Sequence, residues 1–499
     1  MKKQLYLFFT LVAAVSCLKE DPSQYLSPDG FCKTIEQCDA AVASAYTNLN
    51  GVYSYTFDIA MEGCTDLYFI MSDTQDSKMD ISPANARFGN TMWEYAYAGI
   101  RNCNYALWGM ANSGLPADQL KGLVAEATIM RAFWYYLLTS FFGDVPFYEF
   151  YVQNLEQLET VRKMPRMSAV ETRATLIAEL KACIPDLPQQ RRCDVSAGGD
   201  QTLQRAGAAM GWMLLGKLAM WNKDWDSAIF ALEKVETMYG ELTEANYPIS
   251  DIPYSVKNTP ESIFEVQHTY SPSGLKVYSS LAMIAMPYPK SSDDEGHAFY
   301  NGVSIPEIGD NAVVWQPLRP NSFLSNGLYV KNGNDRRMPM TLVWSWNGKN
   351  FSRCWSGPKF WCSGMYNTYD SNNYTIFRYA DAVLMLAECY NEAGRSDEAI
   401  AHLNWVKNRA GITPYGAFRT KEKLLEEIQN ERARELCGEF QRKFDLVRWG
   451  IWFQRTYEYT DYDLLKNNLR PCHEYYPIPD TQVALSGGAL DNKAYEEGL

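Results

Sequence analysis

A pattern of apolar and small residues that occurs twice constrains this fold more than any other feature of the sequence. Segments 211–235 and 380–406 carry corresponding residues at matching positions. They are Trp212, Leu215, Gly216, Ala219, Ala228 and Leu232 in the first segment and Val383, Leu386, Ala387, Tyr390, Ala399 and Leu403 in the second. Small residues at two of these positions let antiparallel helices approach closely, as in tetratricopeptide repeats. Because such pairs bury their apolar faces by stacking, we expect less regular pairs nearby, above all within 92–142.

Helical periodicity is not confined to the two repeats. It extends over residues 34–50 and 92–142, then 168–240 and then 376–456. Between 241 and 375 the sequence turns to Pro, Gly, Asn and aromatics, with short strand-like runs at 263–266 and 341–344. The sequence therefore predicts a mainly α fold, with tetratricopeptide-like helix pairs as scaffold and a large loop-rich insertion carrying short β-strands.

One segment of the periodic regions is apolar around most of its circumference. From Val124 to Phe141 the apolar stripe is too wide for a surface helix, so the segment predicts a buried helix. Gly143 supplies a C-terminal stop and Pro146 prevents resumption. Because aromatics at helical spacing are usually core, we interpret the run Trp134-Tyr135-Tyr136 as packing.

The N-terminus has the pattern of an export signal. Two lysines precede an apolar run over 5–15, which is too short to span a bilayer but suits a signal peptide. Residues 14–16 and Cys17 form the pattern of a bacterial lipobox, in which Cys17 would be acylated, each buried CH₂ contributing about 0.8 kcal/mol. A lysine and two acids at 19–21 resemble a signal for the outside face of a Gram-negative outer membrane. The alternative is an ordinary cleaved signal with an incidental cysteine.

Composition argues against several classes of function. The formal net charge is −13 and no stripe of Lys and Arg occurs, so nucleic acid is not an expected partner. No phosphate loop, dinucleotide-binding turn or nucleophile elbow occurs. The twelve cysteines include no C-x-x-C motif, and the four histidines are far apart in the sequence. Setting Cys17 aside leaves an odd number of cysteines, so they cannot all pair within the chain. We predict no cofactor and no metal site.

Four stretches together resemble the SusD/RagB family of outer-membrane nutrient-binding lipoproteins. They are "SCLKEDP", "FGDVPF", "FRYADAVLMLAECYNEAGRSDEAIAHLNWVKNRAG", and "IQNERARELCGEFQRKFDLVRWG" followed by "YYPIPDTQV". The resemblance implies one α-helical fold, a lipid anchor and a ligand site built from loops opposite the helix pairs. Family members cover TonB-dependent transporters of the SusC type and capture oligosaccharides, sometimes peptides, and they are not catalysts. The tail after Pro479 is looser than the ending common in the family.

The resemblance also divides the chain. Residues 1–16 would be the lipoprotein signal peptide and 17–240 a SusD-like N-terminal helical region. The insertion at 241–375 would belong to the same domain, and 376–499 would be the RagB/SusD C-terminal region with a tetratricopeptide-like pair. The implied location is the outer membrane, lipid-anchored and facing outside. The implied partners are a SusC-type transporter and an oligosaccharide.

The charged run within 431–448 has a structural interpretation. Its opposite charges lie three residues apart, which places them on one helix face, whereas the catalytic carboxylates of glycosidases face each other across a cleft. We therefore predict a clamp between helices, formed by Glu431, Arg434, Glu435, Arg442, Asp445 and Arg448.

Aromatics in the insertion are the candidates for ligand binding. Four of the chain's 14 tryptophans fall within 344–361, and sugar rings pack their C–H faces on indoles while polar side chains bond the hydroxyls. The candidates are Trp344, Trp346, Trp355, Trp361, Trp315, Tyr270 and Tyr300, with Asn85, Arg87 and Phe88 on the earlier loop "SPANARFGN". The alternative is that these tryptophans pack a small strand-containing unit against the helices.

Three classes of function stay open from the sequence. The first is a surface binding protein that delivers oligosaccharides, or peptides or another nutrient, to a transporter. The second is a surface glycosidase with paired carboxylates in the loops of 241–375. The third is a tetratricopeptide adaptor that binds only proteins, for which the aromatic insertion would have no purpose.

Overall fold

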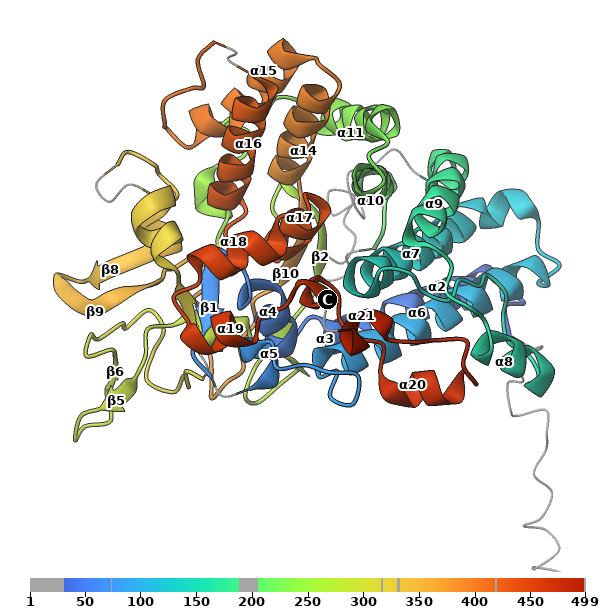
Figure 1. Cartoon of the computed structure of the whole chain (residues 1–499), viewed down its shortest axis with the longest axis horizontal. Helices are drawn as coiled ribbons and strands as arrows, with labels where there is room; N and C mark the ends of the chain where they lie inside the picture. Colours follow the sequence, from blue (N-terminus) through green and yellow to red (C-terminus); the bar gives the residue numbers. More distant parts are fainter. Residues whose placement is uncertain are drawn as a thin grey trace, which may run out of the picture.

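Antiparallel helix pairs run from the top of the molecule down its right side as drawn in Figure 1. The computed structural model describes residues 31–72, 74–187, 205–315, 317–329, 333–417 and 420–497, so the leader and Cys17 lie outside the described residues. The pairs are α6 (Phe88–Ala111) with α7 (Ala117–Phe142), α10 (Ala208–Trp221) with α11 (Trp225–Tyr239), and α14 (Tyr379–Glu392) with α15 (Ser396–Arg409). Helix α7 also packs on α9 (Ala169–Cys183). Helix α16 (Lys421–Glu435) packs on α14 and α15, and α11 packs on α14, which joins the pairs into one stack.

Shorter helices surround these pairs. They are α2 (Ile35–Ala43), α3 (Leu49–Val52), α4 (Tyr55–Glu62), α5 (Gln75–Lys78), α8 (Leu155–Arg162), α12 (Leu281–Ala285), α13 (Met338–Thr341), α17 (Arg442–Arg448), α18 (Trp452–Tyr459), α19 (Asp463–Asn468), α20 (Asp480–Leu485) and α21 (Lys493–Glu496). Short 3₁₀ turns lie at Ser44–Tyr46, Ile184–Asp186, Ile249–Asp251 and Pro471–Glu474, and a π-helical turn lies at Phe323–Leu328.

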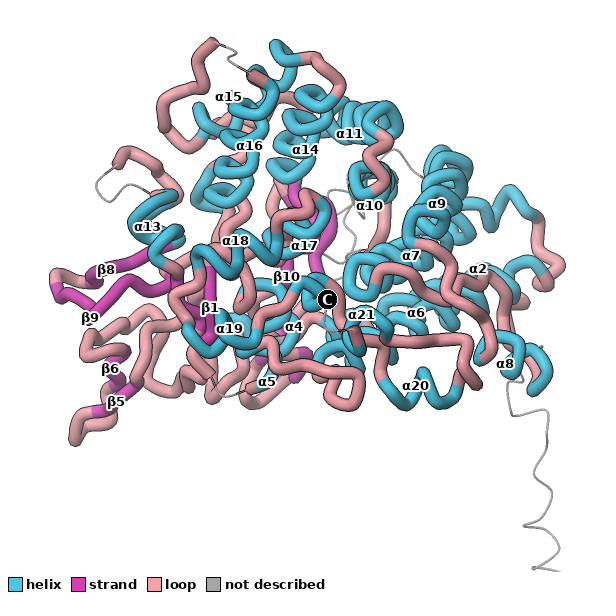
Figure 2. The backbone as a smooth tube through the Cα atoms, viewed as in Figure 1, coloured by secondary structure: helices cyan, strands magenta, loops and turns pink. Residues whose placement is uncertain are grey.

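Strands occur in two-stranded antiparallel sheets among the described residues, and Figure 2 shows them toward the left and centre of the view. The pairs are β1 (Tyr68–Ile70) with β7 (Leu318–Pro320), β2 (Ser262–Val266) with β10 (Tyr374–Arg378), β3 (Thr269–Tyr270) with β4 (Lys276–Val277), β5 (Lys290–Ser292) with β6 (Ala298–Tyr300), and β8 (Leu342–Trp346) with β9 (Lys349–Ser356). The predicted strand-like runs correspond to β2 and β8. The mainly helical class with short strands in a loop-rich insertion is confirmed.

The two repeats form the helix pairs that their small residues predict. Ala228 and Ala399 are fully buried where the paired helices meet. At Gly216 an added Cβ would come within 2.8 Å of the Leu232 side chain, which explains why a residue without a side chain stands there. The repeated pattern therefore marks close helix contacts, as expected.

The apolar segment forms the buried helix that the sequence predicts. Every residue of α7 from Ala125 to Phe142 is buried. The helix ends at Gly143, whose φ of +69° is a conformation that favours glycine. Trp134 donates to the Ala45 carbonyl at 3.1 Å, and Tyr135 donates to the Tyr148 carbonyl at 2.9 Å. These aromatics belong to the core, as interpreted from their spacing.

The predicted charged clamp is present, and it reaches into the insertion. Glu435 accepts hydrogen bonds from Arg337 and Arg378 at 2.7 Å each and also contacts Arg409, with all four side chains buried. Burial opposes ionisation of Glu435, but the neighbouring guanidinium groups outweigh it and hold the pKa of this carboxyl well below its usual value. The network thus joins α16 to Arg337 within the insertion, to Arg378 directly after it and to Arg409 on α15.

The cysteines in the described residues form no cross-links with one another. Ten cysteines there carry free thiols. In the same part of the chain, no group of three or more His, Cys, Asp and Glu side chains is placed to hold a metal ion. Among the described helices none is both long and apolar enough to cross a bilayer.

Candidate functional site

Aromatic side chains gather on a surface built from the loops of the insertion and the start of α4. Three of them, Tyr278, Trp315 and Tyr366, expose close to half of their surface, and the others are partly exposed. We call this set the aromatic platform, and its members are Tyr55, Tyr270, Tyr278, Trp315, Tyr366 and Tyr369.

Three tyrosines of the platform contact one another. The ring centroids of Tyr278 and Tyr369 lie 4.2 Å apart, and those of Tyr270 and Tyr369 lie 5.5 Å apart. The β3–β4 hairpin carries Tyr270, and Tyr278 follows β4 directly. A backbone bridge between Ser279 and Asp370, with N–O distances of 3.0 and 2.9 Å, joins this hairpin to the segment that carries Tyr369. The tyrosine cluster is therefore fixed by backbone pairing.

A second pair of rings adjoins this cluster. The indole of Trp315 lies over Tyr55, with centroids 5.6 Å apart. The backbone N–H of Trp315 donates to the carbonyl of Met283 at 3.1 Å, and that of Val313 donates to Asn367 at 2.7 Å. Because Asn367 lies in the turn between Tyr366 and Tyr369, these bonds place the tryptophan next to the tyrosine cluster.

A buried carboxylate holds the loops beneath the rings. The carboxylate oxygens of Asp370 accept from the backbone N–H of Ala282 at 2.9 Å and of Asn372 at 2.8 Å. Burial raises the pKa of Asp370 to about 6, although these hydrogen bonds oppose the shift. Both oxygens are therefore committed to supporting the backbone of the platform.

Amide side chains flank the exposed rings. Asn311 and Asn367 are exposed, and their backbones are joined by a hydrogen bond of 2.9 Å. An amide both donates and accepts hydrogen bonds, so it suits a ligand rich in hydroxyl groups. The platform thus offers apolar ring faces beside polar groups, which is the composition of sites that bind small polar ring compounds.

Comparison with known proteins supports a family assignment. Residues 359–495 match the family described as the SusD family, and residues 24–193 match the one described as starch-binding associating with outer membrane. Together these matches cover more than half of the chain. The chain belongs to the SusD/RagB family.

Individual SusD-like relatives align over nearly the whole chain. SusD-like protein P25 from Formosa agariphila is 23% identical over 553 residues, covering 99% of this chain and 98% of that protein. Surface glycan-binding protein A from Bacteroides uniformis superposes with a TM-score of 0.72 at 22% identity, covering 93% of this chain and 100% of that chain. Surface glycan-binding protein A from Bacteroides thetaiotaomicron in complex with laminarihexaose gives 0.70 at 18% identity, covering 92% and 99%. These structures share the SusD-like fold.

Two of the residues proposed from the sequence lie in the platform of this SusD/RagB protein, namely Trp315 and Tyr270. The tryptophans of 344–361 instead pack the β8–β9 hairpin. Trp355 and Trp361 are buried, and the ring of Trp346 meets Trp361 edge-on at 4.9 Å. Trp344 is half-buried against the core. For this cluster the structure favours the packing alternative.

The remaining sequence candidates also lie outside the platform contacts. Tyr300 is fully buried and donates to the Gly309 carbonyl at 2.7 Å. Phe88 is buried at the start of α6, with its ring 5.8 Å from that of Phe57. Arg87 is exposed and pairs with Asp76 at 3.4 Å, while Asn85 is half-buried in a tight loop closed by its backbone contact with Ser82.

Four platform tyrosines were not among the sequence candidates. Tyr55 begins a helix in the N-terminal region, so nothing in the sequence associates it with the insertion. Tyr278, Tyr366 and Tyr369 occur in "YSPSGLKVYSS" and "GMYNTYDSNNY", where tyrosines alternate with Ser, Asn, Gly and Pro. That loop-like composition around tyrosine is a better signal for this site than the density of tryptophan.

Proposed function

We propose that this SusD/RagB protein captures oligosaccharides on the aromatic platform at the cell surface and delivers them to a SusC-type TonB-dependent transporter of the outer membrane. A lipid on Cys17 would hold it there. The observation that carries this proposal is the exposure of Trp315 and Tyr278 on rigidly supported loops of an otherwise well-packed protein. Contiguous exposed apolar surface rimmed by polar groups marks ligand or protein interaction sites, whereas single exposed rings need no such explanation.

The chemistry of the platform fits sugars better than other nutrients. Pyranose rings present apolar C–H faces that pack on Trp315 and the tyrosine cluster, while their hydroxyls bond amides such as Asn311 and Asn367. A peptide would more naturally use charged groups for its termini or an open strand edge for its backbone. The names of the relatives also point to glycans, and the bound laminarihexaose of one of them suggests a β-glucan among the first probes.

We infer that the platform binds without catalysis. Glycoside hydrolysis needs two carboxyl groups on opposite sides of the scissile bond. Asp370, the carboxylate directly beneath the platform, is buried and already accepts two backbone hydrogen bonds. It supplies no accessible acid or base to a sugar above it.

A glycan array tests this proposal directly. Soluble protein beginning after Cys17 is applied to an array that includes laminari- and malto-oligosaccharides, and the best ligand is measured by calorimetry. The expected result is saturable binding with no product after prolonged incubation. Turnover by the pure protein, or binding of peptides alone, would contradict the proposal.

Membership in a transporter complex is tested separately. The full chain, purified from outer membranes in mild detergent, is expected to bring a TonB-dependent transporter with it. A Cys17→Ala protein is expected to lose most of that association because it lacks the anchor. Recovery of the full chain free of any transporter, with an intact anchor, would contradict the partner assignment.

A further inference from the structure

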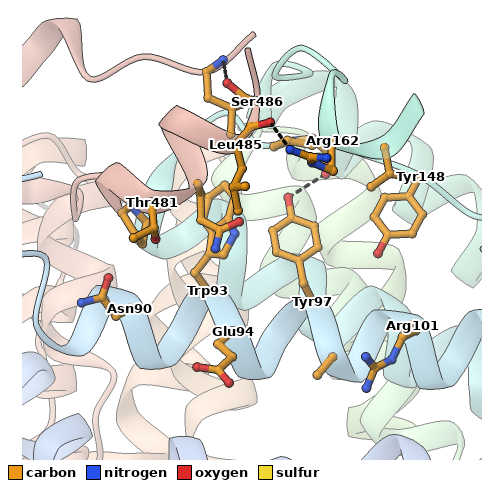
Figure 3. Close-up of a pocket in the computed structure, with 16 residues that line it drawn as sticks. Asn90, Trp93, Glu94, Tyr97, Arg101, Tyr148, Arg162, Thr481, Leu485 and Ser486 are labelled. Carbon is orange, nitrogen blue, oxygen red and sulfur yellow. Dashed lines mark hydrogen bonds between the residues drawn. The ribbon is translucent and has the colours of Figure 1, made fainter. Parts of the chain in front are cut away.

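A concave site separate from the aromatic platform lies between α6, α8 and α20 (Figure 3). Its volume is about 650 Å³, within the range of small-molecule sites. One wall is the face of α6 that carries Trp93 and Tyr97, and the opposite side is formed by α8 and by α20 with the loop after it. We call it the α6–α20 cleft.

Aromatic rings form the floor of this cleft and are fixed in place. The rings of Trp93 and Tyr97 lie 4.9 Å apart, and those of Tyr97 and Tyr148 are parallel with centroids 6.2 Å apart. The Tyr97 hydroxyl donates to the Pro146 carbonyl at 2.8 Å (Figure 3). The floor is therefore preorganised, so ordering it adds little to the cost of binding.

The far side of the cleft is held by contacts between α8 and α20. Arg162 donates to the Leu485 carbonyl at 3.3 Å and also pairs with Glu159 on its own helix. The Ser486 hydroxyl accepts from the backbone N–H of Leu490 at 3.0 Å. The Leu485 side chain is about half exposed. The C-terminal segment thus closes a cleft that is apolar at its centre.

Polar side chains surround the apolar centre of the cleft. Within the part of the chain that the structure describes, none of these side chains makes a hydrogen bond or ion pair. They are Asn90, Glu94, Arg101, Thr481 and Gln482. They come from two elements far apart in sequence, so their convergence on one cleft is a property of the fold. Together they provide several donors and acceptors beside ring faces.

We propose that the α6–α20 cleft is a second carbohydrate site that takes a short neutral oligosaccharide. The partly exposed ring of Tyr97, held by the largely buried rings of Trp93 and Tyr148, matches the C–H face of a sugar, and the surrounding amides and hydroxyl match its hydroxyl groups. The charges of Glu94 and Arg101 cancel, and Arg162 is already paired, so the lining carries no net charge that would select an anionic ligand. This inference rests on the proposed function for the ligand class, but it uses none of the platform residues.

A second site would raise the apparent affinity of the protein for a glycan long enough to occupy both sites. Two weak sites on one chain, occupied by the same polysaccharide, raise the apparent affinity because the second contact is intramolecular. Short oligosaccharides would instead fill the two sites independently.

The experiment removes each site in turn. The platform variant is Trp315→Ala/Tyr278→Ala. The cleft is filled by Ala98→Trp on α6, or stripped by Arg101→Ala/Gln482→Ala, whose exposed or partly exposed side chains can be truncated without opening the core. Ala401→Trp on the exposed face of α15 is the matched control. Each protein is screened against laminari-, malto-, xylo- and manno-oligosaccharides, and the hits are measured by calorimetry.

The expected result is that the platform variant still binds at least one short neutral oligosaccharide. Either cleft variant, combined with the platform variant, should weaken that residual binding at least tenfold, whereas Ala401→Trp should not. If the wild type binds sugar but the platform variant binds none, the second site is wrong and the proposed function stands. If the wild type binds no sugar at all, both proposals fail. Residual binding that survives both cleft variants would also overturn the inference.

Discussion

The rings of Tyr278 and Tyr369 lie with centroids 4.2 Å apart, although the two residues are far apart along the loop-rich insertion. The bridge between their neighbours Ser279 and Asp370 holds the two segments side by side, because two backbone hydrogen bonds fix their register. An exposed ring pair held in this way loses little conformational freedom when a ligand binds. This is the physical basis for assigning recognition to the platform.

The anchor is expected to depend on a single side chain. Cys17→Ala should leave a folded protein that no longer fractionates with the outer membrane, because Cys17, the proposed site of acylation, precedes every described helix. The measurement is the distribution of wild-type and variant protein between membrane and soluble fractions, with thermal unfolding as the check of folding. A variant retained in the outer membrane at the wild-type level would show that lipid on this cysteine is not the anchor.

The scaffold and the platform are expected to respond independently. Ala228→Leu or Ala399→Leu should lower the free energy of unfolding by about 1–3 kcal/mol, because each alanine is fully buried between paired helices. Ala401→Leu on the exposed face of α15 is the control and should change it little. Denaturant unfolding gives the stabilities and calorimetry the glycan affinity, which should stay the same in all three. An unchanged stability for both buried substitutions would contradict the close helix contact.

These helix contacts are the part of the fold that could be predicted from the sequence. The spacing of Gly216 and Ala228 along one segment encodes a local contact, and the apolar circumference of 124–141 encodes burial. Both signals depend only on neighbours along the chain. The charged face within α16 is also a local signal. Its partner Arg337 lies in the insertion, and nothing in the sequence around Arg337 predicts that it pairs with this face.

The platform could be predicted only in part, because it is assembled by long-range pairing. Trp315 and Tyr270 were identified by loop composition, but Tyr55 reaches the site through the packing of α4 beside α12. The tryptophan cluster at 344–361 lies in and beside a two-stranded hairpin, where large side chains also pack against the body, and ligand binding by this cluster stays a prediction. A high density of aromatic residues in the sequence does not distinguish a ligand-binding surface from a hairpin that packs against the body of the protein.

The buried charge network is expected to be sensitive to loss of one carboxylate. Glu435→Gln should lower the free energy of unfolding by roughly 3–5 kcal/mol, because it removes a negative charge that three buried guanidinium groups share and leaves the buried network with an uncompensated positive charge. Glu398→Gln removes an exposed carboxylate that pairs with Arg395 and should change the free energy of unfolding little, because solvent screens an exposed pair. Denaturant unfolding at neutral pH measures both. Equal effects of the two substitutions would show that the network does not stabilise the fold as described.

Another buried carboxyl should make stability fall as the pH rises. Burial raises the pKa of Glu62 from 4.5 to about 8, although the carboxylate accepts from the Phe440 N–H at 2.7 Å. The folded state therefore binds this proton more tightly than the unfolded chain, so the contribution of Glu62 to stability is full below about pH 4.5 and is lost as the pH rises toward 8. Glu62→Gln should remove this part of the pH dependence.

The test compares the slope of unfolding free energy against pH between 5 and 8 in three proteins. Relative to wild type, Glu62→Gln should make the slope less negative, and the exposed control Glu241→Gln should leave it unchanged. Identical slopes for wild type and Glu62→Gln would mean that this carboxyl does not titrate in the range stated.

Calorimetric titration of the soluble protein with its best array ligand tests the platform most directly. Trp315→Ala and Tyr278→Ala remove rings that are 49% and 47% exposed, and Phe230→Ala, which removes a 45% exposed ring from scaffold helix α11, is the matched control. Each platform substitution should weaken glycan binding about tenfold, and the control should bind like wild type with all three folded. If both platform variants bind as tightly as Phe230→Ala, the aromatic platform is not where this protein holds its glycan.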